Sequence, residues 1–400
     1  MGSFLEQSFY FSIISISFLF LSIQAKSPSH KFFNVRSYGA VADGVTDNSA
    51  AFLRAWDDAC KWKGMGRVLI PYGKYNLNSV VFNGPCNNLM MMIIKGVIKA
   101  PTKPKLFFTD HWISFRYING LVINGGGYLD GQGASAWHYN DCYKNPQCSV
   151  LPTSLRLDFV NQSSIHHIKS INSKNVHISI FASNHINISH VRITAPESSP
   201  NTDGIHVADS THIAIRHTVI GTGDDCIAVL SGTDGLDISN VSCGPGHGIS
   251  IGSLGRYGPN EFVRKVTVRN CTLIRTQNGL RIKTWAPSFS SSASELEFVN
   301  VVMKNVRNPI VIDQHYCPFS QCDTRASSSV KISDVKFRNI RGISESRIAV
   351  SLNCSRLVPC RNLQLENINL VYDGPGGRAV SVCSNVRGHS YDKQLPPSCL

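Results

Sequence analysis

"NISHVRI" (187–193), "AIRHTVI" (214–220) and "DISNVSC" (237–243) repeat one arrangement of side chains, and this repeat decides the fold. Each stretch has an apolar, β-favouring residue, two mostly polar residues and a further apolar alternation. The pattern recurs in "TVRNCTL" (267–273), "EFVNVVM" (297–303), "KISDVKF" (331–337) and "QLENINL" (364–370). Successive anchor residues lie 27, 23, 30, 30, 34 and 33 positions apart, and they are Ile188, Ile215, Ile238, Val268, Phe298, Ile332 and Leu365.

Short strands with period-two alternation, separated by Gly, Asn, Ser and Pro, predict a solenoid. Its coils would stack about 4.8 Å apart, so that equivalent residues of successive coils form columns. We therefore expect an all-β chain folded as a single-stranded parallel β-helix. A propeller is the structural alternative, but its blades need roughly 40–50 residues each. A leucine-rich repeat would need a leucine spacing that this sequence lacks.

A solenoid needs covered ends. The stretch 46–62 reads as the one clear helix, with Asp47 or Asn48 able to cap it. We expect this helix to cover the N-terminal end of the stack. The face that it would bury carries Phe52, Trp56, Ala59 and Cys60. The tail from Gly374 onward, with two cysteines, is expected to form a stapled cover at the other end.

The chain has 400 residues, of which 42% are hydrophobic and only 16% charged, as in a packed globular protein. Residues 1–25 are expected to be a signal peptide whose apolar core is Phe9–Ile23, with cleavage after Ala25. A membrane anchor is the alternative, but this apolar segment is short for a span and no later stretch is apolar enough. No linker is evident, so residues 26–400 are expected to be one secreted, soluble domain.

The formal net charge is +13, and removing the signal peptide removes only Glu6, which leaves 39 − 25 = +14. A secreted basic protein meets polyanions outside the cell, namely acidic polysaccharide, membrane surfaces or nucleic acid. Because no basic block or nucleic-acid motif occurs, the charge favours acidic polysaccharide as the partner over nucleic acid or membrane. We expect a monomer.

Thirteen cysteines in a secreted chain predict disulfides. The expected pairs are Cys60/Cys86, Cys142/Cys148, Cys226/Cys243, Cys317/Cys322, Cys354/Cys360 and Cys383/Cys399, which leaves Cys271 over. No CxxC occurs, which argues against a zinc site. Five glycosylation sequons begin at Asn161, Asn187, Asn240, Asn270 and Asn353.

Four segments carry the candidate chemistry: "SPNTDGI" (199–205), "GTGDDC" (221–226), "CGPGHGISIGSLG" (243–255) and "RIKTW" (281–285). Asp203 precedes Asp224 by 21 residues, and Asp225 precedes His247 by 22, which is close to one coil in each case. Arg281 follows His247 by 34 residues, an interval that falls within the range of the longer repeats. Lys283 and Tyr316 are 33 apart, and Asn201 lies two residues before Asp203. These residues are therefore expected on one face of consecutive coils.

Local spacing supports this placement. Arg281 and Lys283 are two residues apart, so on a strand they share a face. Asp224 and Asp225 would normally point to opposite faces, but the glycines at positions 221 and 223 predict a bend that relaxes this.

Three carboxylates with a histidine, an arginine and a lysine have a clear chemical use. Close carboxylates cannot all ionise, so one pKa is pushed upward, and acid and base roles can be divided between them. Glycoside hydrolysis needs this division, and Arg and Lys would bind a carboxylate on the sugar. Taken singly, adjacent aspartates are more often a solvated turn or a cation site. Phosphate is disfavoured as the ligand because no phosphate-cradling glycine loop precedes a helix.

The four segments together closely resemble the polygalacturonases of glycoside hydrolase family 28, and the plant members above all. The resemblance spans nearly all of the mature chain, from "FNVRSYGAVADGVTDNSAAF" (33–52) through "INGGGYLDGQG" (123–133) to "VCSNVRG" (382–388). It implies a right-handed parallel β-helix and an inverting hydrolase of α-1,4-linked galacturonan in the plant cell wall that needs no metal or other cofactor. It also implies exo action of the pollen type.

The resemblance further implies roles for single residues. Asp224 resembles the general acid, and Asp203 and Asp225 resemble the pair that holds and activates water. His247 resembles the residue that supports the acid's protonation. The substrate-binding residues would be Asn201, Arg281, Lys283 and Tyr316. Inversion predicts roughly 6.5–9.5 Å between the acid and the base.

Three alternatives to this function stay open. One is an endo-polygalacturonase, or a related hydrolase that cuts xylogalacturonan or rhamnogalacturonan. Another is a pectate lyase, which would need calcium and an arginine base. The last is a non-catalytic wall-binding protein, against which the complete set of polar residues argues.

Overall fold

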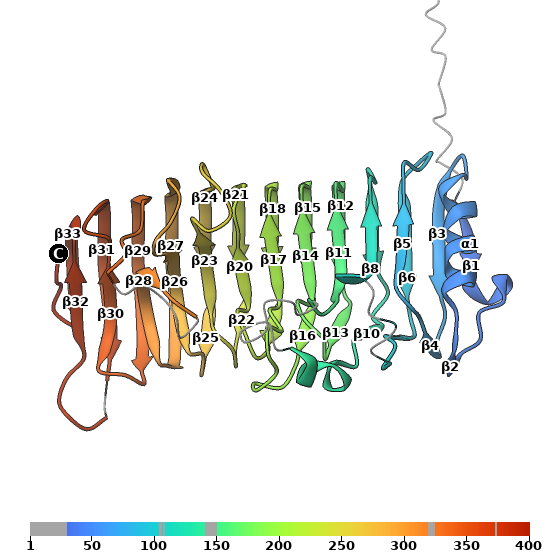
Figure 1. The fold of residues 1–400 in the computed structure, drawn as a ribbon. Helices are drawn as coiled ribbons and strands as arrows, with labels where there is room; N and C mark the ends of the chain where they lie inside the picture. Colours follow the sequence, from blue (N-terminus) through green and yellow to red (C-terminus); the bar gives the residue numbers. More distant parts are fainter. Residues whose placement is uncertain (1–29, 104–105, 107–108, 141–149, 319–324, 373) are drawn as a thin grey trace, which may run out of the picture.

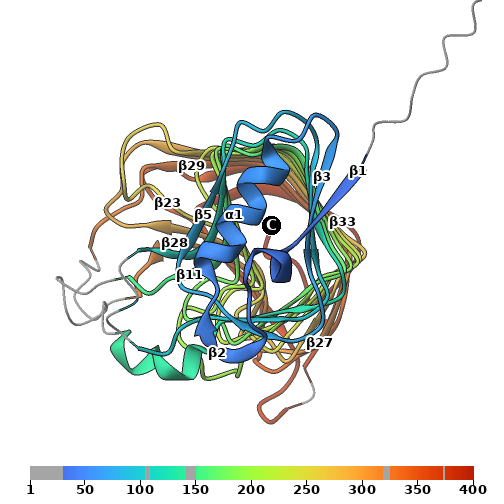
Figure 2. The ribbon, with the colours of Figure 1, turned by 90° about the vertical axis from the view of Figure 1, so that its right-hand side faces the viewer.

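The computed structural model describes residues 30–103, 106, 109–140, 150–318, 325–372 and 374–400, so the expected signal peptide lies outside the described residues. Its strands run parallel and stack coil upon coil along one axis (Figure 1). Viewed along this axis, the coils superimpose around a common interior (Figure 2). Among the described residues, no helix combines the length and apolar character that a membrane crossing requires.

Each coil contributes strands to three faces. The first face is one sheet formed by β5 (Val80–Asn83), β8 (His111–Arg116), β11 (Thr153–Asp158), β14 (Ile178–Phe181), β17 (Ile205–Ala208), β20 (Ile227–Val229), β23 (Ile249–Leu254), β26 (Asn278–Trp285), β28 (Asn308–Tyr316), β30 (Ile348–Asn353) and β32 (Val380–Ser384).

The second and third faces are joined in one larger sheet. The second face begins with β1 (His30–Asn34), β3 (Met65–Ile70), β6 (Met90–Ile94), β9 (Leu121–Asn124), β12 (Asn161–His166), β15 (Asn184–Ser189), β18 (Thr211–Arg216), β21 (Thr233–Ser239) and β24 (Phe262–Arg269). The third begins with β2 (Asp43–Asp47), β4 (Lys74–Asn76), β7 (Val97–Lys99), β10 (Tyr128–Asp130), β13 (Lys169–Ile171), β16 (Arg192–Thr194), β19 (Val219–Gly221), β22 (Ser242–Cys243) and β25 (Thr272–Ile274). In the last coils, single strands run through both faces, namely β27 (Ser291–Val306), β29 (Val330–Ser344), β31 (Cys360–Val371) and β33 (Val386–Leu395).

The predicted anchors form one buried column from Ile188 to Phe298. Each of them pairs in register with the next, and each is fully buried. This arrangement confirms the parallel β-helix and the predicted repeat over these coils. Because every coil buries its apolar residues against the coil above and below, the core is continuous along the axis.

The sixth anchor was predicted wrongly. Phe298 pairs with Phe337, whose ring stacks on it at 4.8 Å, whereas Ile332 pairs with Ala293. The intervals around this coil are therefore 39 and 28 residues, since Phe337 then pairs with Leu365.

Bends in the strands explain this error. The coils bend at residues with a left-handed backbone, such as Asn300 (φ 55°) and its partner in the next coil, Asn339 (φ 55°). Asn adopts this conformation more readily than most residues. β29 has an earlier bend of the same kind at Asp334 (φ 57°), and "KISDVKF" (331–337) surrounds that bend. The two bends have similar local sequences, so the pattern alone did not separate them.

The predicted N-terminal helix is α1 (Ser49–Cys60), which lies across the open end of the first coils (Figure 2). All four residues of its predicted inner face are buried. Asp47 Oδ1 accepts a hydrogen bond from the Ser49 N–H at 3.1 Å, so Asp47 satisfies a backbone donor in the first turn of the helix. Asn48 makes no side-chain cap; it accepts the Val41 N–H at 2.6 Å instead. Three short 3-10 helices, η1 (Val35–Tyr38), η3 (Gly133–Ser135) and η4 (Trp137–Tyr139), complete the described helical elements.

Four predicted disulfides are present, namely Cys60–Cys86, Cys226–Cys243, Cys354–Cys360 and Cys383–Cys399. Cys271 is free and buried, as expected. Cys317 is disulfide-bonded, and its predicted partner Cys322 lies outside the described residues, as does the pair Cys142/Cys148.

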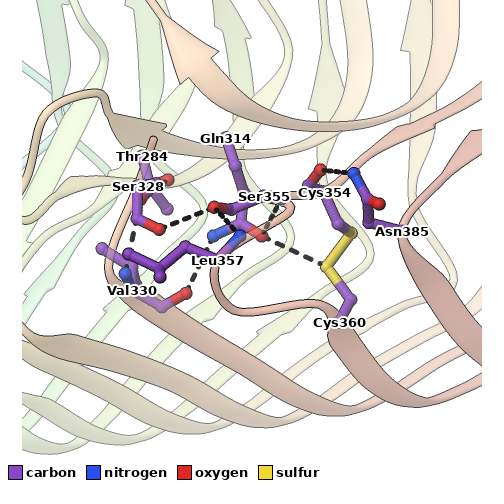
Figure 3. The surroundings of a disulfide bond; sticks show 9 residues. All are labelled: Thr284, Gln314, Ser328, Val330, Cys354, Ser355, Leu357, Cys360 and Asn385. Atoms are coloured by element: carbon purple, nitrogen blue, oxygen red, sulfur yellow. Dashed lines mark hydrogen bonds between the residues drawn. A yellow bond between two sulfur atoms is a disulfide. The ribbon is translucent and has the colours of Figure 1, made fainter. Parts of the chain in front are cut away.

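The C-terminal tail adds β32 and β33 to the stack rather than a separate cover, and Cys383–Cys399 staples it. Near this end, Cys354–Cys360 lies beside the fully buried Gln314 (Figure 3). The Gln314 side chain donates to the Val330 carbonyl at 2.8 Å and accepts the Ser355 N–H at 3.0 Å. Such contacts tie neighbouring coils together.

Candidate active site

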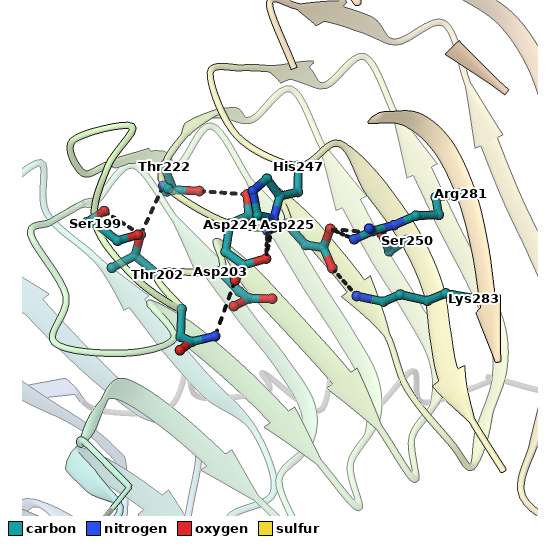
Figure 4. Close-up of polar contacts among 12 residues, drawn as sticks. Ser199, Thr202, Asp203, Thr222, Asp224, Asp225, His247, Ser250, Arg281 and Lys283 are labelled. Atoms are coloured by element: carbon teal, nitrogen blue, oxygen red, sulfur yellow. Dashed lines mark hydrogen bonds and ion pairs between the residues drawn. The ribbon is translucent and has the colours of Figure 1, made fainter. Parts of the chain in front are cut away.

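The candidate residues gather where the chain enters the first face on three consecutive coils (Figure 4). Asp203, Asp225 and His247 each lie two residues before a buried isoleucine that begins β17, β20 or β23. These three isoleucines pair in parallel register, so the polar residues before them form a column. Arg281 and Lys283 follow on β26, which pairs with β23. The predicted placement on one face of consecutive coils is confirmed.

Asp225 is the most buried of the three carboxylates, with 1% of its side chain exposed. Oδ1 accepts hydrogen bonds from Arg281 Nη2 and Ser250 Oγ, both at 2.8 Å. Oδ2 accepts one from Lys283 Nζ, also at 2.8 Å. Arg281 Nε in turn donates to Ser250 Oγ at 3.0 Å. We call Asp225, Ser250, Arg281 and Lys283 the groove cluster.

The groove cluster decides the charge on Asp225. Burial alone would raise the pKa of this carboxyl, but the charges of Lys283 and Arg281 outweigh burial and lower the pKa to about 2. Asp225 is therefore an ionised carboxylate above that pH. Two cations face one anion, so the cluster keeps a net positive charge.

The Asp224 side chain contacts His247 rather than Arg281 or Lys283. The distance between His247 Nδ1 and Asp224 Oδ1 is 2.8 Å. Burial would lower the pKa of His247, but the hydrogen bond to Asp224 and the charge of Asp224 outweigh burial and raise it. Asp224 Oδ1 also accepts the Asp225 N–H at 2.8 Å, and Oδ2 accepts Asn201 Nδ2 at 3.3 Å. One proton can therefore be shared across the contact between Asp224 and His247.

His206 is a site residue that the sequence analysis missed. Its Nε2 lies 2.9 Å from Asp203 Oδ2, and both side chains are largely buried. Burial raises the pKa of Asp203 and the charge of Asp224 raises it further, whereas His206 lowers it. The net direction is upward, so Asp203 is the carboxyl with the raised pKa that crowding predicted. The alternation Ile205–His206–Val207 places His206 on the outer side of β17, and this signal was available in the sequence.

Tyr316 lies at the end of β28 beside the two cations. Its ring centroid is 5.1 Å from Lys283 Nζ and 5.9 Å from the Arg281 guanidinium carbon. A shift in register makes Trp285, rather than Lys283, its partner on β26. The predicted placement of Tyr316 beside the site is confirmed, although the coil interval differs by two residues from the one assumed.

The chain bends at Gly223 and Asp224, so the bend predicted from the glycines before the aspartate pair is confirmed. Neither Gly221 nor Gly223 has a positive φ. A Cβ on Gly223 would lie 1.9 Å from the Ser199 carbonyl oxygen, so this glycine allows two coils to approach closely. Left-handed backbone occurs instead at Gly246 and Gly248, on either side of His247.

Asp224, Asp225 and His247 also offer ligand atoms that lie within 4.8 Å of one another. A cation bound there would have to compete with Arg281 and Lys283 for the oxygens of Asp225, and their charges would repel it. The donor set therefore fits a divalent metal poorly and fits proton transfer well.

Residues 60–394 match the model of glycosyl hydrolases family 28. The chain belongs to glycosyl hydrolase family 28. The sequence is 47% identical to an exopolygalacturonase from Platanus acerifolia over 369 residues, which are 92% of this chain and 97% of that protein. It is 43% identical to a polygalacturonase from Brassica napus, covering 92% of each chain.

The fold of this family 28 chain also resembles solved structures. A hyperthermoactive exopolygalacturonase from Thermotoga maritima superimposes with a TM-score of 0.76 over 92% of both chains at 17% sequence identity. An endo-xylogalacturonan hydrolase from Aspergillus tubingensis superimposes with a TM-score of 0.78 over 89% of this chain and 96% of that one, at 22% identity. At such low identities the structures support the β-helix and not a choice of substrate.

Proposed function

We propose that Asp203, Asp224, Asp225 and His247 are the catalytic residues of an inverting, exo-acting polygalacturonase. As a member of family 28, the chain is a glycoside hydrolase of pectin. The observation that carries the assignment is the groove cluster, which places two cations beside the Asp224–His247 contact. A galacturonan has one carboxylate on every sugar, so fixed cations beside a proton donor match this substrate.

Arg281 and Lys283 would bind the carboxylate of a galacturonate residue. Asp225 balances only one of their two charges and holds both side chains in place. The ring of Tyr316 lies beside both cationic groups, at 5.9 Å from the Arg281 guanidinium carbon and 5.1 Å from Lys283 Nζ. Arginine can bind a carboxylate through two parallel hydrogen bonds, whereas lysine acts as a point charge.

Asp224 would donate its proton to the glycosidic oxygen as the bond from that oxygen to the anomeric carbon breaks. A water held near Asp203, Asp225 and Asn201 would attack the anomeric carbon from the opposite face. Asp203 would accept the proton that this water loses, and Asp225 would supply a fixed negative charge. The proton that Asp203 gains equals the one that Asp224 gives away, so exchange with solvent restores the enzyme.

Asp203 is the carboxyl with the raised pKa, whereas a base must be ionised before it can accept a proton. We infer that His206 helps to keep Asp203 ionised. Its contact at 2.9 Å favours the ionised form of Asp203 and can receive the proton afterwards. Asp203 and His206 would then act together as the base, and Asp224 and His247 would act together as the acid.

We also propose that the protein is secreted into the plant cell wall as a glycoprotein. The four described disulfides are consistent with an oxidising, extracellular compartment. All five sequon asparagines are exposed, which glycosylation requires. The signal peptide, the single domain at 26–400 and the monomeric state remain predictions.

Product analysis on galacturonate oligomers of defined length tests the function. An exo enzyme releases one product from an end and lowers the viscosity of polygalacturonate slowly relative to the number of new reducing ends. A rapid fall in viscosity at low conversion would replace the exo assignment with endo action. Activity on xylogalacturonan or rhamnogalacturonan but not on galacturonate oligomers would show that the substrate is one of those two polymers.

Two further measurements separate the remaining alternatives. A pectate lyase would lose activity in EDTA and form an unsaturated product that absorbs ultraviolet light. A wall-binding protein would bind polygalacturonate without forming reducing ends. Asp224→Asn should abolish hydrolysis while the variant stays folded, and hydrolysis by that variant at the wild-type rate would reject the assigned general acid.

A further inference from the structure

A pocket of about 270 Å³ opens at the end of β26, beyond the groove cluster. Its lining residues are Gly255, Arg256, Trp285, Pro287, Ser288 and Phe289. Arg281, Lys283 and Trp285 are spaced two residues apart on β26, so their side chains share one face of the strand. The strand therefore leads from the proposed carboxylate-binding residues directly to the pocket.

Side-chain contacts make this connection continuous. The Tyr316 ring lies 5.1 Å from Lys283 Nζ on one side and 5.4 Å from the Trp285 ring on the other. The Arg256 guanidinium then lies 4.3 Å from the Trp285 ring centroid. Trp285 Nε1 donates to Ser253 Oγ at 2.8 Å, which fixes the orientation of the indole. Through Tyr316, the residues that line the pocket are thus in contact with the groove cluster.

The chemistry of the pocket fits a sugar acid. Phe289 is 51% exposed and faces the pocket together with Trp285 and Pro287, which give it an apolar wall. A pyranose ring has an apolar face of C–H groups that packs on such aromatic surfaces, while Arg256 offers a charge to a carboxylate. An apolar wall with one convergent charged group is the usual composition of a ligand site.

We propose that Arg256, Trp285 and Phe289 form an outer subsite that binds a further uronic-acid residue of the same polysaccharide chain. The inference rests on the proposed function, because it extends the groove in which that polymer would lie. Continuity with the groove cluster and the positive charge of Arg256 select an acidic polysaccharide over a protein partner as the occupant. The subsite would be filled only by oligomers longer than the shortest one that the enzyme cleaves.

Two substitutions test the subsite. Phe289→Ala removes the exposed ring, and Arg256→Met removes the charge but keeps a stem that can cover Trp285. We expect each to lower kcat/KM about fivefold on long galacturonate oligomers and less than about twofold on the shortest oligomer that the wild type hydrolyses. The measurement is kcat/KM against oligomer length for the wild type and both variants.

The chain supplies a matched control at its N-terminal end. The Arg67 guanidinium carbon lies 5.5 Å from the ring centroid of Phe32, which is 50% exposed, far from the groove. Phe32→Ala and Arg67→Met should leave kcat/KM unchanged at every length. Equal losses at all lengths in Phe289→Ala and Arg256→Met, or no loss at any length, would overturn the subsite. If the wild type cleaves no galacturonate oligomer, the proposed function fails instead, so the two failures are distinguishable.

Discussion

Asp237 and Asp225 are two of the described aspartates that are each contacted by two cationic side chains, and these two differ mainly in burial. Asp237 on β21 lies 3.0 Å from Arg216 Nη2 and 3.0 Å from Arg269 Nε, and we call these three residues the outer cluster. Its carboxylate side chain is 27% exposed, whereas that of Asp225 in the groove cluster is 1% exposed. Both clusters join side chains from neighbouring coils.

This difference in burial changes how much the contacts between an aspartate and two cations contribute to stability. In the outer cluster, water screens the charges, and such pairs contribute between about 0 and 1 kcal/mol. In the groove cluster, removing one partner leaves charge uncompensated in a dry environment, which typically costs about 3–5 kcal/mol. The groove cluster also lies next to Asp224 and His247, whereas the outer cluster lies on β18, β21 and β24 of the second face. We therefore read the outer cluster as structural and the groove cluster as functional.

The largest expected effect is the loss of activity in Asp225→Asn. The substitution leaves Arg281 and Lys283 without their shared anion and removes the fixed negative charge near the attacking water. We expect kcat/KM on galacturonate oligomers to fall about 10³-fold. Asp237→Asn is the matched control in the outer cluster and should stay within about twofold of the wild type. A variant Asp225→Asn that folds and keeps more than about a tenth of the wild-type activity would contradict the role of the groove cluster.

The next effect concerns stability against pH. The pKa of Asp225 is lowered to about 2 in the folded state from 3.8, so its contribution is present above about pH 4 and is lost as the pH falls toward about 2. This shift corresponds to about 2 kcal/mol. The free energy of unfolding of the wild type should therefore fall more between about pH 5 and about pH 2.5 than that of Asp225→Asn, by about that amount. Equal losses in the two proteins, measured by urea unfolding, would show that Asp225 is not held ionised by its neighbours.

His206 allows a smaller test of the same groove. Because His206 lowers the pKa of Asp203, His206→Asn should raise that pKa further. If Asp203 must be ionised to accept a proton, the acidic limb of the pH profile of kcat/KM should move to higher pH, with about a tenfold loss below it. The other charged groups that face His206 are Asp225 and Lys283, and both stay in place.

His212→Asn on the second face is the control for this test. The His212 ring is exposed and stacks on His185 at 4.6 Å, away from the groove. We expect no shift of the limb in this variant. An unshifted limb in His206→Asn as well would mean that His206 has only a packing role beside Asp203.

The smallest effect is expected in the outer cluster itself. Asp237→Asn should lower the free energy of unfolding by about 0.5 kcal/mol at low salt, and by less at about 1 M salt, where screening weakens exposed pairs. Thermal or urea unfolding at the two salt concentrations measures this difference. A loss that exceeds about 2 kcal/mol and does not depend on salt would remove the contrast between the two clusters.

Much of the fold was predictable because a solenoid repeats local rules. The inner positions of the strands, the buried face of α1 and the four described disulfides follow from spacing and periodicity alone. The column of Asp203, Asp225 and His247 was predictable for the same reason, since equal intervals place residues on adjacent coils. The coil at Phe337 was not, because two bends of β29 have similar sequences.

The sequence by itself determined that the candidate residues share one face of consecutive coils, and the tertiary structure decided what state each of them is in. Crowding among three carboxyls predicted one raised pKa, but only the contacts of Asp225 with Arg281 and Lys283 show that it belongs to Asp203. The partnership of Asp203 and His206 and the close approach at Gly223 were settled in the same way. The physical reason is that periodicity fixes position along and around the coils, whereas a pKa depends on burial and on the sum of all nearby charges, which come from distant parts of the chain.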